Sequence, residues 1–192
     1  FLNLVVLTAD IPAIRDVDFD GDLDVLAFQE AGNKVYYIKN TAVEQGLPLD
    51  SLVFQLEDRC WGGFAEDFLS ADIYLASAPG LCANDLKEDP ANKTPLHAFS
   101  TINVFDVDGD MDVDVFVGDA DLDKISFLEN EKTDGIDWCN RQTLDFPENN
   151  TAIQMDAFLV PYFVNIDGDP EKEMVVSSNQ FNNSKNVIPM LT

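Results

Sequence analysis

Five aspartates alternate with other residues in one short stretch of the chain. They lie in the segment DVDFDGDLDVLAF at residues 16–28 and are Asp16, Asp18, Asp20, Asp22 and Asp24. These like charges would repel one another, and a bound cation would remove that cost. The spacing matches the first nine positions of a calcium loop, with oxygen ligands at 1, 3 and 5, a backbone carbonyl at 7 and a carboxylate at 9. Gly21 falls at position 6, where the sharp turn favours a residue without a Cβ.

The same pattern returns twice along the chain. The segment DVDGDMDVDVFVG at 106–118 aligns without gaps, and its predicted ligands are Asp106, Asp108, Asp110, Asp112 through its carbonyl, and Asp114. The segment NIDGDPEKEMVV at 165–176 aligns more weakly, and its predicted ligands are Asn165, Asp167, Asp169, Glu171 through its carbonyl, and Glu173. The sequence therefore predicts Ca²⁺ at the first two loops and leaves binding at the third open.

Position 6 differs among the three loops. Met111 stands there in the second loop, and a non-glycine residue in the left-handed conformation costs about 1 kcal/mol. Pro170 stands there in the third loop with its φ locked, so this loop must turn differently, bind weakly or bind no ion. Gly109 and Gly168 stand two residues earlier, at position 4, and can relocate the turn to that position. Solvated turns without metal are the alternative, and Mg²⁺ is a weaker one because it tolerates irregular protein cages poorly.

Short strand-like segments surround each loop. Their period-2 alternation and β-branched or aromatic content predict strands, and no long segment has helical periodicity. They are IPAI, LHAFSTINVF and MDAFLVPYFV before the loops, VLAF, VFVG and MVV after them, then NKVYYIKN, DKISFLEN and KNVIPML, and finally SLVFQLED and RQTLDF. The predicted unit is a four-stranded antiparallel sheet with the acidic loop between its first two strands, which is typical of a β-propeller blade. We expect an all-β fold with about three blades of a larger propeller.

The repeats divide the chain into five segments. We expect the tail strand of a preceding blade at 1–9, a blade with the first loop at 10–59, an insertion at 60–95, a blade with the second loop at 96–150 and a blade with a degenerate third loop at 151–192. Cys60 and Cys82 bracket the insertion and can form a disulfide that stabilises by about 3 kcal/mol; two buried free thiols are the alternative. Cys139 is left over as a buried thiol or pairs with a cysteine elsewhere.

Composition and motifs exclude several classes of function. The net charge of −25 argues against nucleic acid and anionic membrane surfaces as partners. No apolar run approaches the length of a membrane span, so membrane insertion is not expected. His97 is the only histidine, and no hydrolase, metalloprotease or P-loop motif is present, so we expect no enzyme and no catalytic residue. Most aromatic side chains are expected in the core, and Trp61 is the best candidate for a ligand-binding surface.

The repeats resemble the FG-GAP/VCBS repeat family. The residues that carry the resemblance are DVDFDGDLDVLAF, DVDGDMDVDVFVGD and the strand endings VYYIKN and ISFLEN. The resemblance is good across 10–40 and 96–130 and partial across 158–192, and it implies propeller blades with calcium-binding loops. The arrangement of CWGGFAEDF between two repeats, with LHAFSTINVFDVDGD leading into the second, is similar to large secreted surface proteins of gliding bacteria with type IX secretion.

This resemblance implies a secreted or cell-surface module in which Ca²⁺ has a structural role. We expect an adhesion or interaction scaffold whose partners are a protein or glycan ligand and the remainder of a longer chain or propeller. One alternative is an ancillary carbohydrate-binding or structural domain of a secreted polysaccharide-degrading enzyme, which aromatic residues in an exposed groove beside a metal-free carboxylate pair would indicate. Another is a spacer within a surface filament, which predicts no groove.

Overall fold

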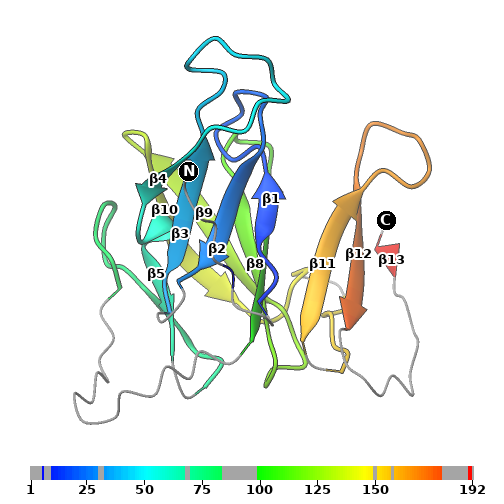
Figure 1. Cartoon of the computed structure of the whole chain (residues 1–192). Helices are drawn as coiled ribbons and strands as arrows, with labels where there is room; N and C mark the ends of the chain where they lie inside the picture. Colours follow the sequence, from blue (N-terminus) through cyan, green and yellow to red (C-terminus); the bar gives the residue numbers. More distant parts are fainter. Residues whose placement is uncertain are drawn as a thin grey trace.

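The computed structural model places the chain in antiparallel β-sheets (Figure 1). The structure describes Val6 and residues 10–29, 33–67, 70–83, 99–148, 151–156, 158–178 and 190–191. Within these residues the chain forms strands and one 3-10 turn, η1 (Trp61–Gly63), but no α-helix. The expected all-β fold is therefore confirmed. The predicted tail strand at 1–9 lies outside the described residues except for Val6.

The first sheet is a four-stranded meander. Its strands are β1 (Ala13–Arg15), β2 (Asp24–Phe28), β3 (Val35–Asn40) and β4 (Phe54–Asp58), paired in the order β1-β2-β3-β4. The run DVLAF of β2 is buried along its whole length, which is typical of a central strand covered on both faces. The first acidic loop joins β1 to β2, as the sequence predicts.

The second sheet repeats this arrangement. Its strands are β7 (Ser100–Phe105), β8 (Asp114–Asp119), β9 (Ser126–Thr133) and β10 (Ile136–Thr143), paired in the order β10-β9-β8-β7. The second acidic loop joins β7 to β8, and β8 is buried throughout. The predicted strand RQTLDF is only partly correct, because β10 begins at Ile136 and ends at Thr143. Asp134 and Gly135 have φ of 52° and 80°, and this left-handed pair lets a tight hairpin turn extend both strands.

A third sheet follows the third acidic loop. Its described strands are β11 (Leu159–Val164), β12 (Glu173–Ser178) and β13 (Met190–Leu191), paired in the order β11-β12-β13. The loop again joins the first two strands of its sheet. Of the predicted strand KNVIPML, only residues 190–191 lie within the described part of the chain.

The insertion after the first sheet has structure of its own. It begins with η1 and continues through a two-stranded sheet of β5 (Phe64–Glu66) and β6 (Ile73–Leu75). Cys60 and Cys82 form the predicted disulfide, with 5.9 Å between their Cα atoms. Residues 84–98, which include His97, lie outside the described residues.

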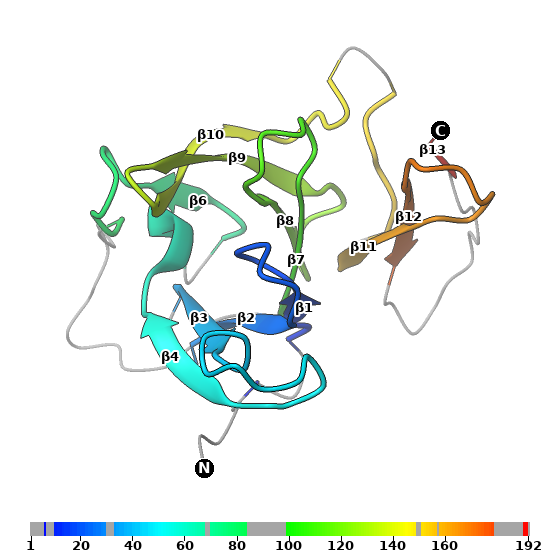
Figure 2. The same cartoon turned by 90° about the horizontal axis from the view of Figure 1, so that it is seen from above.

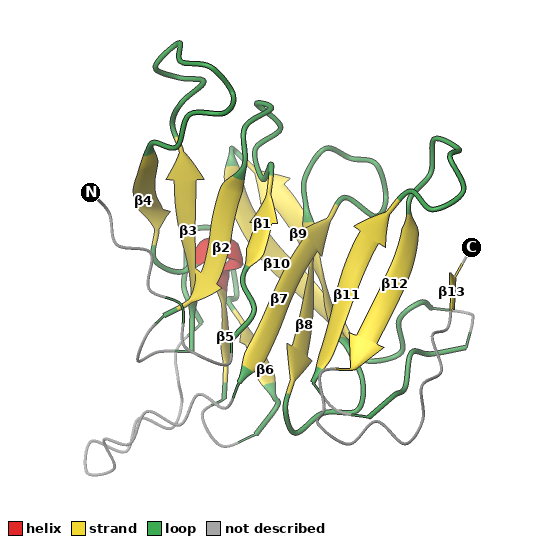
Figure 3. Ribbon diagram, turned by 45° about the vertical axis from the view of Figure 1, so that its right-hand side comes forward, coloured by secondary structure: helices red, strands yellow, loops and turns green. Residues whose placement is uncertain are grey.

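The first strands of the three larger sheets, which are β1, β7 and β11, lie side by side. Ile11, just before β1, forms a parallel bridge with Thr101 of β7. The hydroxyl of Thr101 donates to the carbonyl of Leu159 in β11 at 2.6 Å, and Figure 3 shows β7 beside β11. The remaining strands of the first two sheets extend away from β1 and β7 (Figure 2). Within the described residues the sheets do not close into a ring.

Two apolar clusters fill the spaces between these sheets. One lies between the first two sheets and includes Trp61, which is 1 % exposed, and the free thiol of Cys139. The expectation that Trp61 forms a ligand surface is therefore wrong, because this side chain packs in the core. The other cluster joins the second and third sheets around Phe116 and Phe163. Gly118 lets these sheets approach closely, since a Cβ there would lie 1.9 Å from the carbonyl oxygen of Leu159.

Candidate functional site

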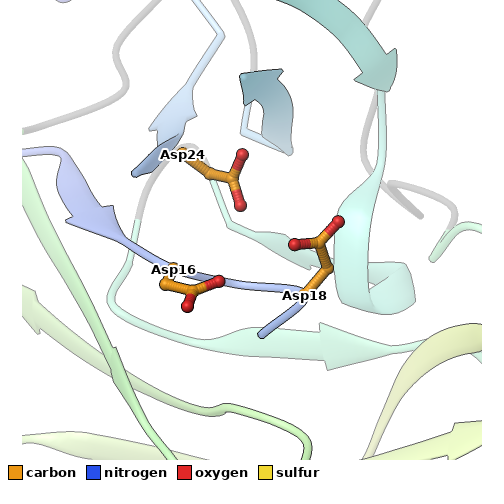
Figure 4. A group of neighbouring side chains, drawn as sticks. All are labelled: Asp16, Asp18 and Asp24. Carbon is orange, nitrogen blue, oxygen red and sulfur yellow. The ribbon is translucent and has the colours of Figure 1, made fainter. Parts of the chain in front are cut away.

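The first acidic loop brings carboxylates together from both of its ends. One oxygen each of Asp16, Asp18 and Asp24 lie within 4.8 Å of one another, and Figure 4 shows the three side chains around a common space. A second group combines Asp18 and Asp20 with Glu44. Glu44 comes from the connection between β3 and β4. Such groups of carboxylates can hold a metal ion, and Asp18 belongs to both.

Backbone amides hold the first loop in a tight curl. The amide of Gly21 donates to Asp16 Oδ2 at 3.0 Å, and the amide of Asp22 donates to Asp20 Oδ1 at 3.0 Å. The amide of Asp20 makes a longer contact of 3.4 Å with Asp18 Oδ1. These bonds turn the carboxylates inward around the loop backbone.

Three oxygens of this loop are buried and have no hydrogen-bond partner within the described part of the chain. They are Oδ1 of Asp16, Oδ2 of Asp20 and Oδ1 of Asp22. Asp22 is 1 % exposed, and its other oxygen accepts from the amide of Val43 at 3.2 Å. A buried acceptor left without a partner costs roughly 1–3 kcal/mol, and more when it is charged. A bound cation would satisfy these oxygens.

Asp24 at position 9 anchors the loop to the sheet. Its Oδ2 accepts from the amide of Val17 at 3.1 Å and from the phenol of Tyr37 at 3.2 Å. Its Oδ1 accepts from the amide of Asn40 at 2.8 Å. Burial raises the pKa of Asp24 to about 6, although these hydrogen bonds lower it. The carboxylate therefore has an architectural role in addition to its predicted role as a ligand.

The second loop repeats the anchoring hydrogen bonds of the first but brings a different set of carboxylates together. Oxygens of Asp106, Asp108 and Asp110 lie within 4.8 Å of one another. Asp114 accepts from the amides of Val107 at 3.1 Å and Asn130 at 3.0 Å, as Asp24 does in the first loop. The structure does not bring Asp114 into the group of three. Because Asp108 and Asp110 are exposed, water can reach the carboxylates of this loop.

Asp112 and its counterpart Asp22 each accept a hydrogen bond from a backbone amide outside their own loop. Asp112 Oδ2 accepts from the amide of Lys132 at 2.8 Å, so this side chain ties the loop to β9. Burial raises the pKa of Asp112 and of Asp114 to about 6. Each of these side chains accepts a backbone amide through Oδ2, and Oδ1 of Asp22 is left without a partner within the described residues.

The third loop forms a more exposed group. Oxygens of Asp167, Asp169 and Glu173 lie within 4.8 Å of one another. Glu173 accepts from the amide of Ile166 at 2.7 Å and so takes the anchoring place of Asp24. Asn165 Oδ1 accepts from the amide of Gly168 at 2.6 Å, and neither Asn165 nor the exposed Glu171 joins the group.

Positions 4 and 6 of the first two loops both adopt the left-handed conformation. Phe19 and Gly21 have φ of 63° and 103°, and Gly109 and Met111 have φ of 82° and 71°. Each loop has a glycine at only one of the two positions. The sequence predicts the left-handed turn at position 6, and Gly109 indicates from the sequence that position 4 can also be left-handed. In the third loop, Gly168 has φ of 89°.

Like Glu44, Lys39 lies at the first loop although the acidic motif does not include it. Its ammonium forms ion pairs with Asp18 and with Glu44. Burial lowers the pKa of Lys39, but the hydrogen bonds and charges of the two carboxylates raise it overall. Neither Lys39 nor Glu44 carries a sequence signal, because they reach the loop only through the pairing of β2 with β3 and the connection that follows.

A cleft of about 280 Å³ lies beside the first loop, between the first two sheets. Its lining is mostly charged and includes Asp18, Lys39, Asp58 and Asp137. Trp61 also borders it, but its indole nitrogen donates to Asp137 Oδ2 at 3.1 Å and the ring is buried. The cleft therefore offers little aromatic surface to a sugar.

A pair of carboxylates lies outside the three acidic loops. Ser100 donates its hydroxyl to Glu66 at 2.9 Å and makes a longer contact of 3.5 Å with Asp119. Burial raises the pKa of Glu66 well above its usual value. Glu66 and Asp119 are 3 % and 7 % exposed, so a polymeric substrate cannot reach them.

Fold and site together define an all-β protein with acidic clusters that can hold metal ions. The chain matches no protein-family model, and no curated protein or solved structure is significantly similar to it. Within the described residues, no helix is long and apolar enough to cross a membrane.

Proposed function

We propose that this chain is a calcium-binding structural module built from propeller blades. The observation that carries the proposal is the set of three buried oxygens without partners in the first loop, on Asp16, Asp20 and Asp22. A solvated turn would expose these oxygens to water. Ca²⁺ accepts six to eight oxygen ligands in flexible geometry, whereas Mg²⁺ requires a near-ideal octahedron, so an irregular protein cage favours Ca²⁺.

The ion at each loop has a mechanical role in this proposal. It neutralises the carboxylates of the loop and links the ends of two paired strands, so that metal binding contributes to folding. The second loop repeats the hydrogen bonds of the first, which supports a second site around Asp106, Asp108 and Asp110. Three sheets with adjacent first strands, two of them four-stranded meanders, support the assignment of propeller blades.

The wider role that we propose is a secreted or cell-surface interaction scaffold. A disulfide between Cys60 and Cys82 is compatible with an oxidising compartment. Leu47, Leu49 and Leu52 are exposed on the connection between β3 and β4, where they offer apolar contacts to a protein partner. The alternative of an ancillary domain in a polysaccharide-degrading enzyme has less support, because the cleft beside the first loop is mostly charged and the aromatic rings that border it are buried. Calcium-dependent binding to a glycan array would favour that alternative.

Thermal unfolding of the purified chain in millimolar Ca²⁺, in Mg²⁺ and in EDTA tests the metal proposal. We expect Ca²⁺ alone to raise Tm by many degrees, because a ligand that binds only the folded state stabilises it. Isothermal titration should detect Ca²⁺ binding at both of the first two loops. Asp16→Asn should abolish binding at the first loop, and Asp106→Asn should abolish binding at the second. Asp50→Asn, at an exposed position, serves as the matched control. Identical melts in all three solutions would overturn the proposal.

A further inference from the structure

Lys39 places a positive charge at the edge of the first acidic loop. Its ammonium contacts Asp18 Oδ2 and Glu44 Oε1, and the Lys39 and Asp18 side chains are 20 % and 22 % exposed. Asp18 belongs to both groups of carboxylates that can hold an ion, and Glu44 belongs to the second. The lysine therefore contacts the oxygens that a metal ion would need.

The ammonium satisfies the loop only in part. It carries one charge and three donors, and the buried oxygens of Asp16, Asp20 and Asp22 remain without partners within the described residues. A divalent ion with six to eight ligands can reach more of these oxygens than an ammonium can. The two cations repel each other at such short range, so both cannot occupy the loop without a cost.

The second loop is an internal comparison without this lysine. Asn40 and Asn130 make the same hydrogen bond to Asp24 and Asp114, so Glu129 occupies the place of Lys39. Glu129 pairs with Arg141. Within the described part of the chain, no lysine or arginine contacts Asp106, Asp108 or Asp110.

We infer that Lys39 is a tethered counter-ion that Ca²⁺ displaces from the first loop. This inference rests on the proposed calcium function and adds a competing side chain to it. Once displaced, the ammonium can turn into the adjacent cleft, where Glu57 and Asp58 provide other carboxylates, whereas Asp137 already faces Lys132 at 3.6 Å. Glu44, released from the lysine, becomes a ligand from the connection between β3 and β4. The ion thus replaces a lysine bridge with a metal bridge, and the lysine lowers the affinity of this site.

Calcium titration of proteins that lack the second site tests the inference. In an Asp106→Asn background, Lys39→Met should bind Ca²⁺ about tenfold more tightly or better, since a repelling charge has been removed. Lys39→Arg should keep the weak affinity. Lys124→Met, which removes a surface lysine paired with Asp145, is the matched control and should change nothing. Lys39→Gln is the second uncharged variant if Lys39→Met folds poorly.

Stability provides an independent readout. In EDTA, Lys39→Met should unfold at lower temperature than the parent, because Asp18 and Glu44 lose their counter-ion. The rise of Tm on adding Ca²⁺ should be larger in the variant. A lysine with only a structural role would lower Tm equally in both solutions. Equal or weaker Ca²⁺ affinity of Lys39→Met and Lys39→Gln would overturn this inference alone, whereas no binding by the parent protein would overturn it together with the proposed function.

Discussion

Asp24 accepts a hydrogen bond from the backbone amide of Asn40 at 2.8 Å, across 16 residues of sequence. Asp114 and Asn130 form the same bond at 3.0 Å, also across 16 residues. Each bond ties the last carboxylate of an acidic loop to the third strand of its sheet, β3 or β9. The two loops are therefore fixed to their sheets by hydrogen bonds of their own carboxylates.

Asp24→Ala should destabilise the metal-free protein. The substitution leaves the amides of Val17 and Asn40 without their acceptor, and a buried donor without a partner costs roughly 1–3 kcal/mol. Because removal of a buried charge offsets part of this loss, we expect the free energy of unfolding to fall by about 2 kcal/mol in EDTA. Urea unfolding measures it, with the exposed Asp50→Ala as control. Equal stability of the two variants would contradict the anchoring role.

The stability of the metal-free protein should fall as pH rises from about 4 to 6. Burial raises the pKa of Asp24, Asp112 and Asp114 to about 6, from the ordinary aspartate value of about 3.9. In this range the folded state binds more protons than the unfolded state, so the slope of unfolding free energy against pH is negative. With Ca²⁺ the trend should reverse, since the ion binds the deprotonated carboxylates. Urea titrations at several pH values, with EDTA or Ca²⁺, check both signs.

Met111→Gly should stabilise the second loop. Met111 has φ of 71° and its side chain is 68 % exposed, so the substitution removes strain and little packing. Relief of the backbone strain contributes about 1–2 kcal/mol, and the greater freedom of glycine in the unfolded chain offsets part of it. The free energy of unfolding should therefore rise by about 0.5 kcal/mol. Met111→Ala keeps the strain and should give no such gain. Thermal unfolding of both variants decides the matter, and a gain in the alanine variant alone would contradict the argument.

Loss of the disulfide should lower stability by about 3 kcal/mol, because the bond between Cys60 and Cys82 closes a loop across 22 residues. Replacement of both cysteines by serine, or reduction of the parent protein, should give similar losses in urea unfolding. The reducing agent should have no effect on the double serine variant. A large effect there would point to the remaining thiol of Cys139 instead.

Alternation of apolar residues and the spacing of aspartates were sufficient to predict much of the architecture. The strands on both sides of each acidic loop lie where the pattern places them, because short apolar runs bounded by turn residues are typical of buried strands. The Cys60–Cys82 pair was likewise readable from the sequence. The hairpin at Asp134 and Gly135 was not predicted, because its left-handed turn lengthens β10 beyond the apolar pattern.

The sequence by itself determined that several carboxylates lie close together at each of the three loops, since side chains two residues apart are neighbours in a tight turn. Tertiary structure alone decided which carboxylates are buried and what faces them. Glu44 and Lys39 reach the first loop through strand pairing, whereas the equivalent Glu129 pairs with Arg141. Burial and pairing depend on distance in space, and residues far apart in sequence acquire that distance only when the sheets form and pack.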